Sequence, residues 1–323
     1  NLFTMKKGLC FFYLLIFILL TACGSPDDGA SHSVYADEVS FLDPSVDPSV
    51  VKGTRDNSVR CLVPEAPGTT AFSSSNALID ISNAAEGYIC AAYSGGCPKV
   101  KLQITGPDGV TYSYDMRGGQ EYFPLSAGSG TYTVGVYENI TSNQYSVNLV
   151  EDFDITVTNE FGAFLYPNQY CMFDSSSETV KKASDLAFFA DTDLDVVTNI
   201  YNYVIKTISY DYDMAENIQS GYVCDVDAAL KRGRGICLDY AAVMTCMLRS
   251  QGIPARLEVG YAGSAYHAWI SAYVDEKGWI NGIIEFDGVN WSLMDPTFSS
   301  NTEREELKNF IGDGSNYLLK YVY

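Results

Sequence analysis

Apolar and polar residues alternate in short runs along the first half of the chain. Residues 99–105 alternate strictly and end at the turn sequence Gly106-Pro107-Asp108-Gly109. A period of two is typical of a half-buried strand, and Gly and Pro mark its end. Further runs of this kind lie at 111–114, 130–137, 145–150 and 154–158. Several short strands at this spacing predict a small antiparallel β-sandwich over residues 61–158.

The period changes to that of helices in the second half. Apolar residues share one helical face within 177–189, 193–208 and 238–251, and Gly252 and Pro254 end the last of these segments. Strand-like runs follow at 255–261, 265–274 and 292–295, and the tail reads as a helix at 303–309 and a strand at 317–323. Helices followed by antiparallel strands predict an α+β domain over residues 159–323.

The N-terminus has the pattern of a targeting segment. Lys6 and Lys7 precede an apolar stretch at 9–20 that is too short for a typical spanning helix. The sequence Leu-Thr-Ala-Cys ending at Cys23 resembles a bacterial lipobox, in which the cysteine is acylated. The prediction is a lipoprotein signal peptide at 1–22, a lipidated Cys23 and a flexible linker over 23–60. The alternative is an ordinary signal peptide with a chance cysteine.

Composition narrows the classes of function. The 323 residues include 40 acidic and 20 basic side chains, which gives a net charge of −20. Because phosphate contacts need clustered Lys and Arg, we expect no direct binding to nucleic acid. An extracytoplasmic location permits disulfides, and Cys90 and Cys97 flank a hairpin-like Tyr-Ser-Gly-Gly segment that makes them a candidate pair. No Cys-x-x-Cys spacing is present, so no zinc site is predicted.

Three side chains have the order and residue types of a cysteine-based catalytic triad. Cys237 follows a glycine-containing loop at the start of a predicted helix, whose dipole favours a thiolate. His267 lies on a predicted strand, about 30 residues later, and Asp295 ends another, about 28 residues further on. These types fit a nucleophile, its base and an orienting carboxylate. Trp269, two residues from His267, is predicted to line the substrate site or to shield the ion pair.

These motifs carry a resemblance to a known family. Gly-Ile-Cys-Leu-Asp-Tyr-Ala at 235–241, Arg-Ser-Gln-Gly-Ile-Pro-Ala-Arg at 249–256, Tyr-His-Ala-Trp at 266–269 and Met-Asp-Pro-Thr at 294–297 resemble the bacterial transglutaminase-like superfamily. The resemblance covers roughly 177–300. It implies a papain-like core, and the superfamily includes acyl-transferring transglutaminases, cysteine peptidases and members that have lost activity.

The resemblance implies a surface-anchored cysteine enzyme. It would form a thioester on an amide of a protein or a peptidoglycan peptide, and pass the acyl group to an amine or to water. The expected fold is a papain-like α+β core preceded by the sandwich. No cofactor or metal is implied, and the expected membrane contact is the lipid anchor. The alternative is a catalytically inactive surface protein with a binding or structural role.

Overall fold

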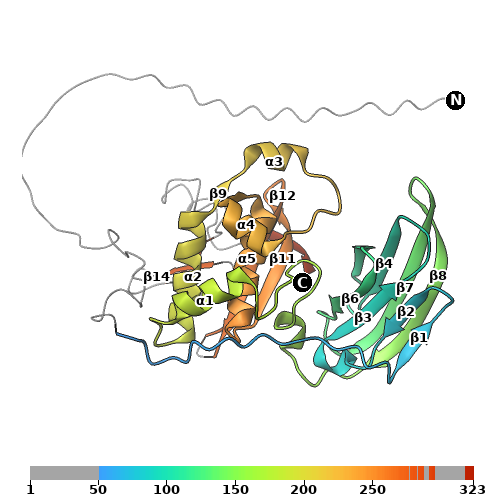
Figure 1. Cartoon of the computed structure of the whole chain (residues 1–323), viewed down its shortest axis with the longest axis horizontal. Coiled ribbons are helices and arrows are strands. Elements are labelled where there is room, and N and C mark those ends of the chain that lie inside the picture. The colour runs from blue at the N-terminus through green and yellow to red at the C-terminus, as the bar shows by residue number, and fades with distance from the viewer. Residues whose placement is uncertain (1–50, 276, 282, 287–290, 295–316) are drawn as a thin grey trace, which may run out of the picture. The chain divides into compact units, whose positions relative to one another are not determined.

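The computed structural model of the chain (Figure 1) describes residues 51–275, 277–281, 283–286, 291–294 and 317–323. The predicted signal peptide, Cys23, Asp295 and the predicted helix at 303–309 lie outside the described residues. The described residues belong to a single structural unit, Val51–Tyr323. Among the helices described, none combines the length and the apolar character that crossing a membrane requires.

Two four-stranded antiparallel sheets confirm the predicted sandwich. One sheet has the order β1-β2-β3-β6 and the other the order β5-β4-β7-β8. The strands are β1 (Ala71–Ser73), β2 (Ala77–Asp80), β3 (Tyr88–Tyr93), β4 (Val100–Thr105), β5 (Thr111–Met116), β6 (Gly119–Pro124), β7 (Gly130–Thr141) and β8 (Gln144–Ile155). Ring contacts join the two sheets, for example between Tyr114 and Phe123.

The alternation along β4 fixes which side chains face the core and which face outward. Val100, Leu102 and Ile104 are 4%, 0% and 1% exposed. Lys101 and Gln103 lie between them in sequence and point to the opposite face of the sheet. The outer face of β4 is therefore polar, and its Lys101 lines the candidate site.

One buried helix organises the second half of the chain. The helices are α1 (Glu178–Ala187), α2 (Asp193–Thr207), α3 (Tyr212–Asn217), α4 (Val226–Arg232) and α5 (Cys237–Ser250). Every residue of α5 from Asp239 to Ser250 is buried. Helices α1, α2 and α4 pack on it from one side, and strands β11 and β12 from the other (Figure 1). A helix buried on all sides must be apolar around its circumference, as this one largely is.

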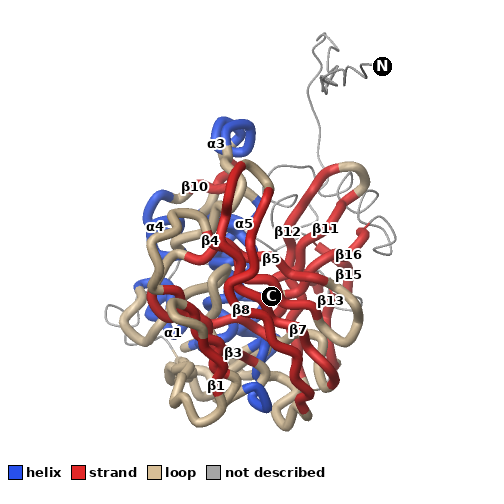
Figure 2. The backbone as a smooth tube through the Cα atoms, turned by 90° about the vertical axis from the view of Figure 1, so that its right-hand side faces the viewer, coloured by secondary structure: helices blue, strands red, loops and turns tan. Residues whose placement is uncertain are grey.

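The sheet beneath α5 is antiparallel, with the order β13-β12-β11-β16. Its strands are β11 (Ala255–Ala262), β12 (Ala265–Val274), β13 (Gly278–Asn281) and β16 (Tyr317–Val322), and Figure 2 shows β11, β12 and β16 side by side. Two short pairs complete the fold: β14 (Ile283–Phe286) with β15 (Trp291–Met294), and β9 (Ser209–Tyr210) with β10 (Arg234–Gly235). The predicted α+β class is confirmed.

Residues 51–60 differ from the flexible linker that their polar composition predicts. The N–H of Gly53 donates to the carbonyl of Phe188 at 2.9 Å, and the N–H of Arg60 donates to the carbonyl of Ser250 at 2.8 Å. Arg55 donates to the carbonyl of Gln251 at 2.8 Å. The polar groups of this segment therefore satisfy backbone groups at helix ends, a use that composition alone does not reveal.

Cys90 and Cys97 do not form the disulfide that the sequence analysis considered. All seven described cysteines are free thiols. Cys90 is buried in the middle of β3, whereas the Cys97 thiol lies 3.3 Å from the carbonyl of Lys99 and 3.6 Å from that of Asn139. Strand β3 ends at Tyr93, between Cys90 and Cys97, so the two side chains lie in different surroundings.

A fully buried arginine joins four parts of the described structure. Arg249, near the end of α5, is 0% exposed. Its guanidinium donates to the carbonyl of Ala255 at 3.0 and 2.8 Å, to that of Tyr166 at 2.7 Å and to that of Tyr323 at 2.8 Å. Burial lowers the pKa of this guanidinium, and the hydrogen bonds that it donates to the three carbonyls compensate for the water that it has lost. One side chain thus links α5, the connection from the sandwich, β11 and the residue after β16.

We expect Arg249→Met to destabilise the fold strongly. The substitution leaves the carbonyls of Ala255 and Tyr166 without this donor, at about 1–3 kcal/mol each, whereas the carbonyl of Tyr323 keeps the N–H of Leu257 at 3.0 Å. The free energy of unfolding should therefore fall by at least about 2 kcal/mol. Urea denaturation followed by circular dichroism measures this. Arg117→Met, at an exposed position, is the control and should change it by less than about 0.5 kcal/mol. Equal stability of the two variants would contradict the role given to Arg249.

Candidate active site

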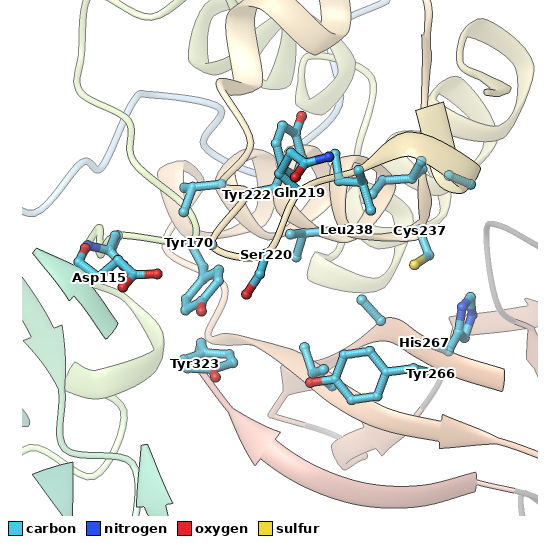
Figure 3. A pocket seen from close by; sticks show the side chains of 18 of the residues that line it. Asp115, Tyr170, Gln219, Ser220, Tyr222, Cys237, Leu238, Tyr266, His267 and Tyr323 are labelled. Carbon is cyan, nitrogen blue, oxygen red and sulfur yellow. The ribbon is translucent and has the colours of Figure 1, made fainter. Parts of the chain in front are cut away.

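A cavity of about 450 Å³ contains the two described members of the expected triad. Cys237 and His267 both line it, together with residues of the loop 218–223 and of the sandwich strands β4 and β5 (Figure 3). In Figure 3, Asp115 lies at one end, and Cys237 and His267 lie at the other with the sulfur directed toward the imidazole. The cavity therefore offers a thiol and an imidazole to one ligand.

Cys237 is the first residue of α5. The residue before it, Ile236, is in an extended conformation with φ −96° and ψ 176°, so the helix begins sharply at the thiol. Helix-terminal N–H groups have no intrahelical acceptors, and the positive end of the dipole favours an anion there. The side chain is half-buried, which leaves the sulfur accessible from the cavity. This placement is the one that the sequence predicts for a nucleophile.

A buried carboxylate holds the start of this helix. Asp239 is 0% exposed. Its Oδ2 accepts the N–H of Ile236 at 2.8 Å, and its Oδ1 accepts the hydroxyl of Tyr222 at 2.6 Å. Arg232 lies 3.6 Å from Oδ2. The carboxylate is thus occupied by neighbours on both oxygens, and it ties the loop carrying Tyr222 to the residue before the thiol.

Gly235 is required by this arrangement. A Cβ at this position would lie 2.6 Å from both the Cβ and Oδ2 of Asp239, closer than real contacts allow. Its neighbour Gly233 ends α4 with φ 65°, in the left-handed region. The two glycines of the Gly-Arg-Gly sequence before the thiol are therefore needed for different reasons. Gly233 turns the chain, and Gly235 makes room for Asp239.

His267 lies on β12, opposite Gly260 of β11, and is 6% exposed. Its ring stacks on Trp269, with ring centroids 6.3 Å apart and an angle of 23° between the planes. Trp269 is itself 5% exposed, packs edge-on against Tyr317 at 5.0 Å, and is absent from the described lining of the cavity. Both roles considered for Trp269, shielding the ion pair and lining the substrate site, stay predictions.

Tyrosines form much of the remaining wall. The sequence analysis did not single out Tyr170, Tyr222 or Tyr323, yet all three line the cavity. Tyr266, next to His267, is 61% exposed and lines it as well, in a T-shaped contact with Tyr261 at 5.5 Å. Only the position of Tyr266 beside the histidine motif was a signal for this in the sequence. No group of three or more metal-ligating side chains occurs among the described residues.

Most other described thiols are poor competitors for Cys237. Burial raises the pKa of Cys61 and of Cys90 to about 11. Burial also raises the pKa of Cys171, Cys224 and Cys246. A thiol with a raised pKa is protonated and unreactive at neutral pH. Chemical labelling near pH 7 can therefore distinguish Cys237 from these five.

We expect Tyr222→Phe to loosen the loop at 218–223. The substitution removes a hydrogen bond to a buried carboxylate, which contributes about 1.5–3 kcal/mol. Amide hydrogen exchange of the loop should become faster, and the free energy of unfolding should fall by a similar amount. Tyr212→Phe is the matched control because Tyr212 is 65% exposed. Unchanged exchange in Tyr222→Phe would argue that other contacts fix the loop.

Comparisons with known proteins agree with the motif. Residues 181–282 match the model of the transglutaminase-like superfamily. A protein-glutamine gamma-glutamyltransferase from Pseudomonas aeruginosa is 31% identical over 100 residues, which are 26% of this chain and 13% of that protein. The UPF0252 protein of Methanocaldococcus jannaschii is 31% identical over 91 residues, which are 24% of this chain and 26% of that protein. The chain thus spans about an eighth and a quarter of these two relatives.

Solved structures give distant likenesses. A Cytophaga hutchinsonii protein provisionally described as a cysteine protease has a TM-score of 0.37 at 14% identity, over 79% of this chain and 74% of that one. Red sea bream transglutaminase has a TM-score of 0.23 at 14% identity, over 65% and 48%. Likenesses this distant carry no argument about the site. The matched segment 181–282 contains both Cys237 and His267, and this part of the chain is similar to the transglutaminase-like superfamily.

Proposed function

We propose that the protein is a surface-anchored cysteine enzyme that forms a thioester on an amide substrate and passes the acyl group to an amine or to water. The observation that carries the proposal is that Cys237, at a helix N-terminus, and His267 line the same cavity. The Pseudomonas relative, named as a glutamyltransferase, supports the acyl-transfer chemistry. The lipid anchor at Cys23 is part of the proposal and rests on the sequence alone.

The chemistry follows from the two side chains. The sulfur of Cys237 as a thiolate attacks the carbonyl carbon of the amide, and the oxyanion faces the helix N-terminus, where the N–H of Cys237 can donate to it. The imidazolium of His267 gives its proton to the leaving nitrogen, so ammonia or an amine departs and a thioester remains. The same imidazole then deprotonates the incoming amine or water. Asp295 is proposed to orient the imidazole.

We expect Cys237 to be alkylated by iodoacetamide rapidly at pH 6.5, and His267→Ala to lose this reactivity. The imidazole is the proposed base that activates the thiol, so its removal should slow alkylation. Peptide mass mapping across pH 6–9 measures the rate at each cysteine. Cys61 and Cys90 are internal standards that should stay unlabelled. Equal pH profiles for Cys237 in both proteins would favour an inactive, binding or structural protein.

We also expect the protein without its predicted signal peptide and without Cys23 to incorporate a labelled primary amine into glutamine peptides. When no amine is present, it should release ammonia from them. Cys237→Ala should abolish both reactions, because no thioester can form. Mass spectrometry of the acid-quenched enzyme should detect the thioester in the wild type only. If neither product nor thioester forms with any amide peptide, the proposed function is wrong.

A further inference from the structure

We propose that the outer face of the sandwich extends the active-site cleft and binds an acidic group of the substrate through Lys99. The inference rests on the proposed function and deepens it, because it names the charge of the substrate and the module that reads it. It also gives the sandwich a role in specificity, where the sequence offered only a spacer or a binding module.

The first step is that the cavity at Cys237 continues onto the sandwich. A second cavity of about 480 Å³ lies on the outer face of β4, β5 and β7. The two cavities share four lining residues: Lys101, Ser113, Asp115 and Ser220. The two cavities therefore adjoin at Ser220 and Asp115, so a substrate that places its amide at Cys237 reaches toward the outer face of the sheet. An extended peptide advances about 3.3 Å per residue along such a path.

The second step is that this wall is fixed relative to the thiol. The amide of Gln169 donates to the carbonyl of Asp115 at 2.8 Å and to Glu121 at 2.7 Å. The hydroxyl of Tyr112 on β5 accepts the N–H of Val322 at 3.3 Å, and its ring lies 5.6 Å from that of Tyr323. These contacts join the sandwich to the sheet that carries His267. A fixed wall can impose selectivity because it does not rearrange to fit every substrate.

The third step is the charge of the shared groove. Lys101 pairs with Asp115 at 2.6 Å, which neutralises both. The Nζ of Lys99 lies 5.7 Å from the centre of the Tyr145 ring, and Asp115 is the only carboxylate among the described lining residues of the two cavities. Glu138, at the next position after Tyr137, instead accepts the hydroxyl of Tyr93 and the amide of Asn148. One positive charge is thus left in the groove.

This charge stands out against the rest of the molecule. The chain has a net charge of −20, so acidic substrates are repelled from its surface in general. A local positive site beside the cleft gives such substrates one favourable route of approach. Three polar side chains that line the same cavity can hydrogen-bond a peptide backbone along the way: Gln103, Ser113 and Asn143. The predicted ligand is an extended peptide with a carboxylate a few residues from the reacting amide.

The test is a charge exchange between enzyme and substrate. Glutamine peptides carry one Asp, or one Lys in its place, at positions two to six residues on either side of the glutamine. The wild type, Lys99→Glu and Lys181→Glu are compared by kcat/KM for amine incorporation. Lys181 is exposed on α1 and lines neither cavity, so its variant changes the net charge equally and serves as the control.

We expect the wild type and Lys181→Glu to prefer the best Asp peptide over its Lys counterpart by about fivefold at low salt, as for an exposed ion pair. Lys99→Glu should reverse the preference at the same peptide position. The preference should shrink at 0.5 M salt because of screening. The same ratio in all three proteins would overturn the inference and leave the proposed function intact.

A second experiment tests the groove if the protein forms no thioester. In that case, fluorescence anisotropy measures binding of the same peptides to Cys237→Ala, with and without Lys99→Glu. Binding that favours acidic peptides and is lost with Lys99→Glu supports the groove although the proposed function has failed. Binding without charge preference, or no binding at millimolar peptide, overturns it.

Discussion

The structure depends on two buried charges at the two ends of α5. Asp239 lies in the first turn and Arg249 in the last, both 0% exposed. Each charge is opposite in sign to the partial charge of the helix end at which it lies, which is the favourable arrangement. More importantly, each charge gathers groups from other segments: Asp239 binds Ile236 and Tyr222, and Arg249 binds three backbone carbonyls. These hydrogen bonds fix both ends of α5 to the segments around it.

This constraint decides the geometry of the thiol. Cys237 has no freedom to slide along the cavity, because the residue before it is held by Asp239 and the far end of its helix is held by Arg249. The histidine is fixed separately, by its strand and by its contact with Trp269. The site therefore combines a nucleophile positioned by a helix and a base positioned by a sheet. Such rigid support from regular elements is what precise catalytic geometry needs.

The sequence was most informative where one local pattern determines structure. The alternation in β4 and the helical spacing in α2 predicted those elements nearly to the residue, and the motifs around Cys237 and His267 predicted their common cavity. Strand β3 was not predicted because its residues are almost all buried, so its sequence shows no alternation of apolar and polar positions. Lys99, Tyr170 and Tyr323 could not be assigned to a shared groove, because segments far apart in the chain bring them together. The position of Asp295 stays a prediction.

The late position of β16 in the chain has a consequence for timing. This strand pairs with β11, and the carbonyl of Tyr323 right after it is one of the three acceptors of Arg249. Until β16 has docked on β11, the guanidinium of Arg249 lacks one of its acceptors. Contacts this distant in sequence form last because closing a long loop costs entropy. The helix that carries Cys237 therefore reaches its final setting only after β16 has docked on β11.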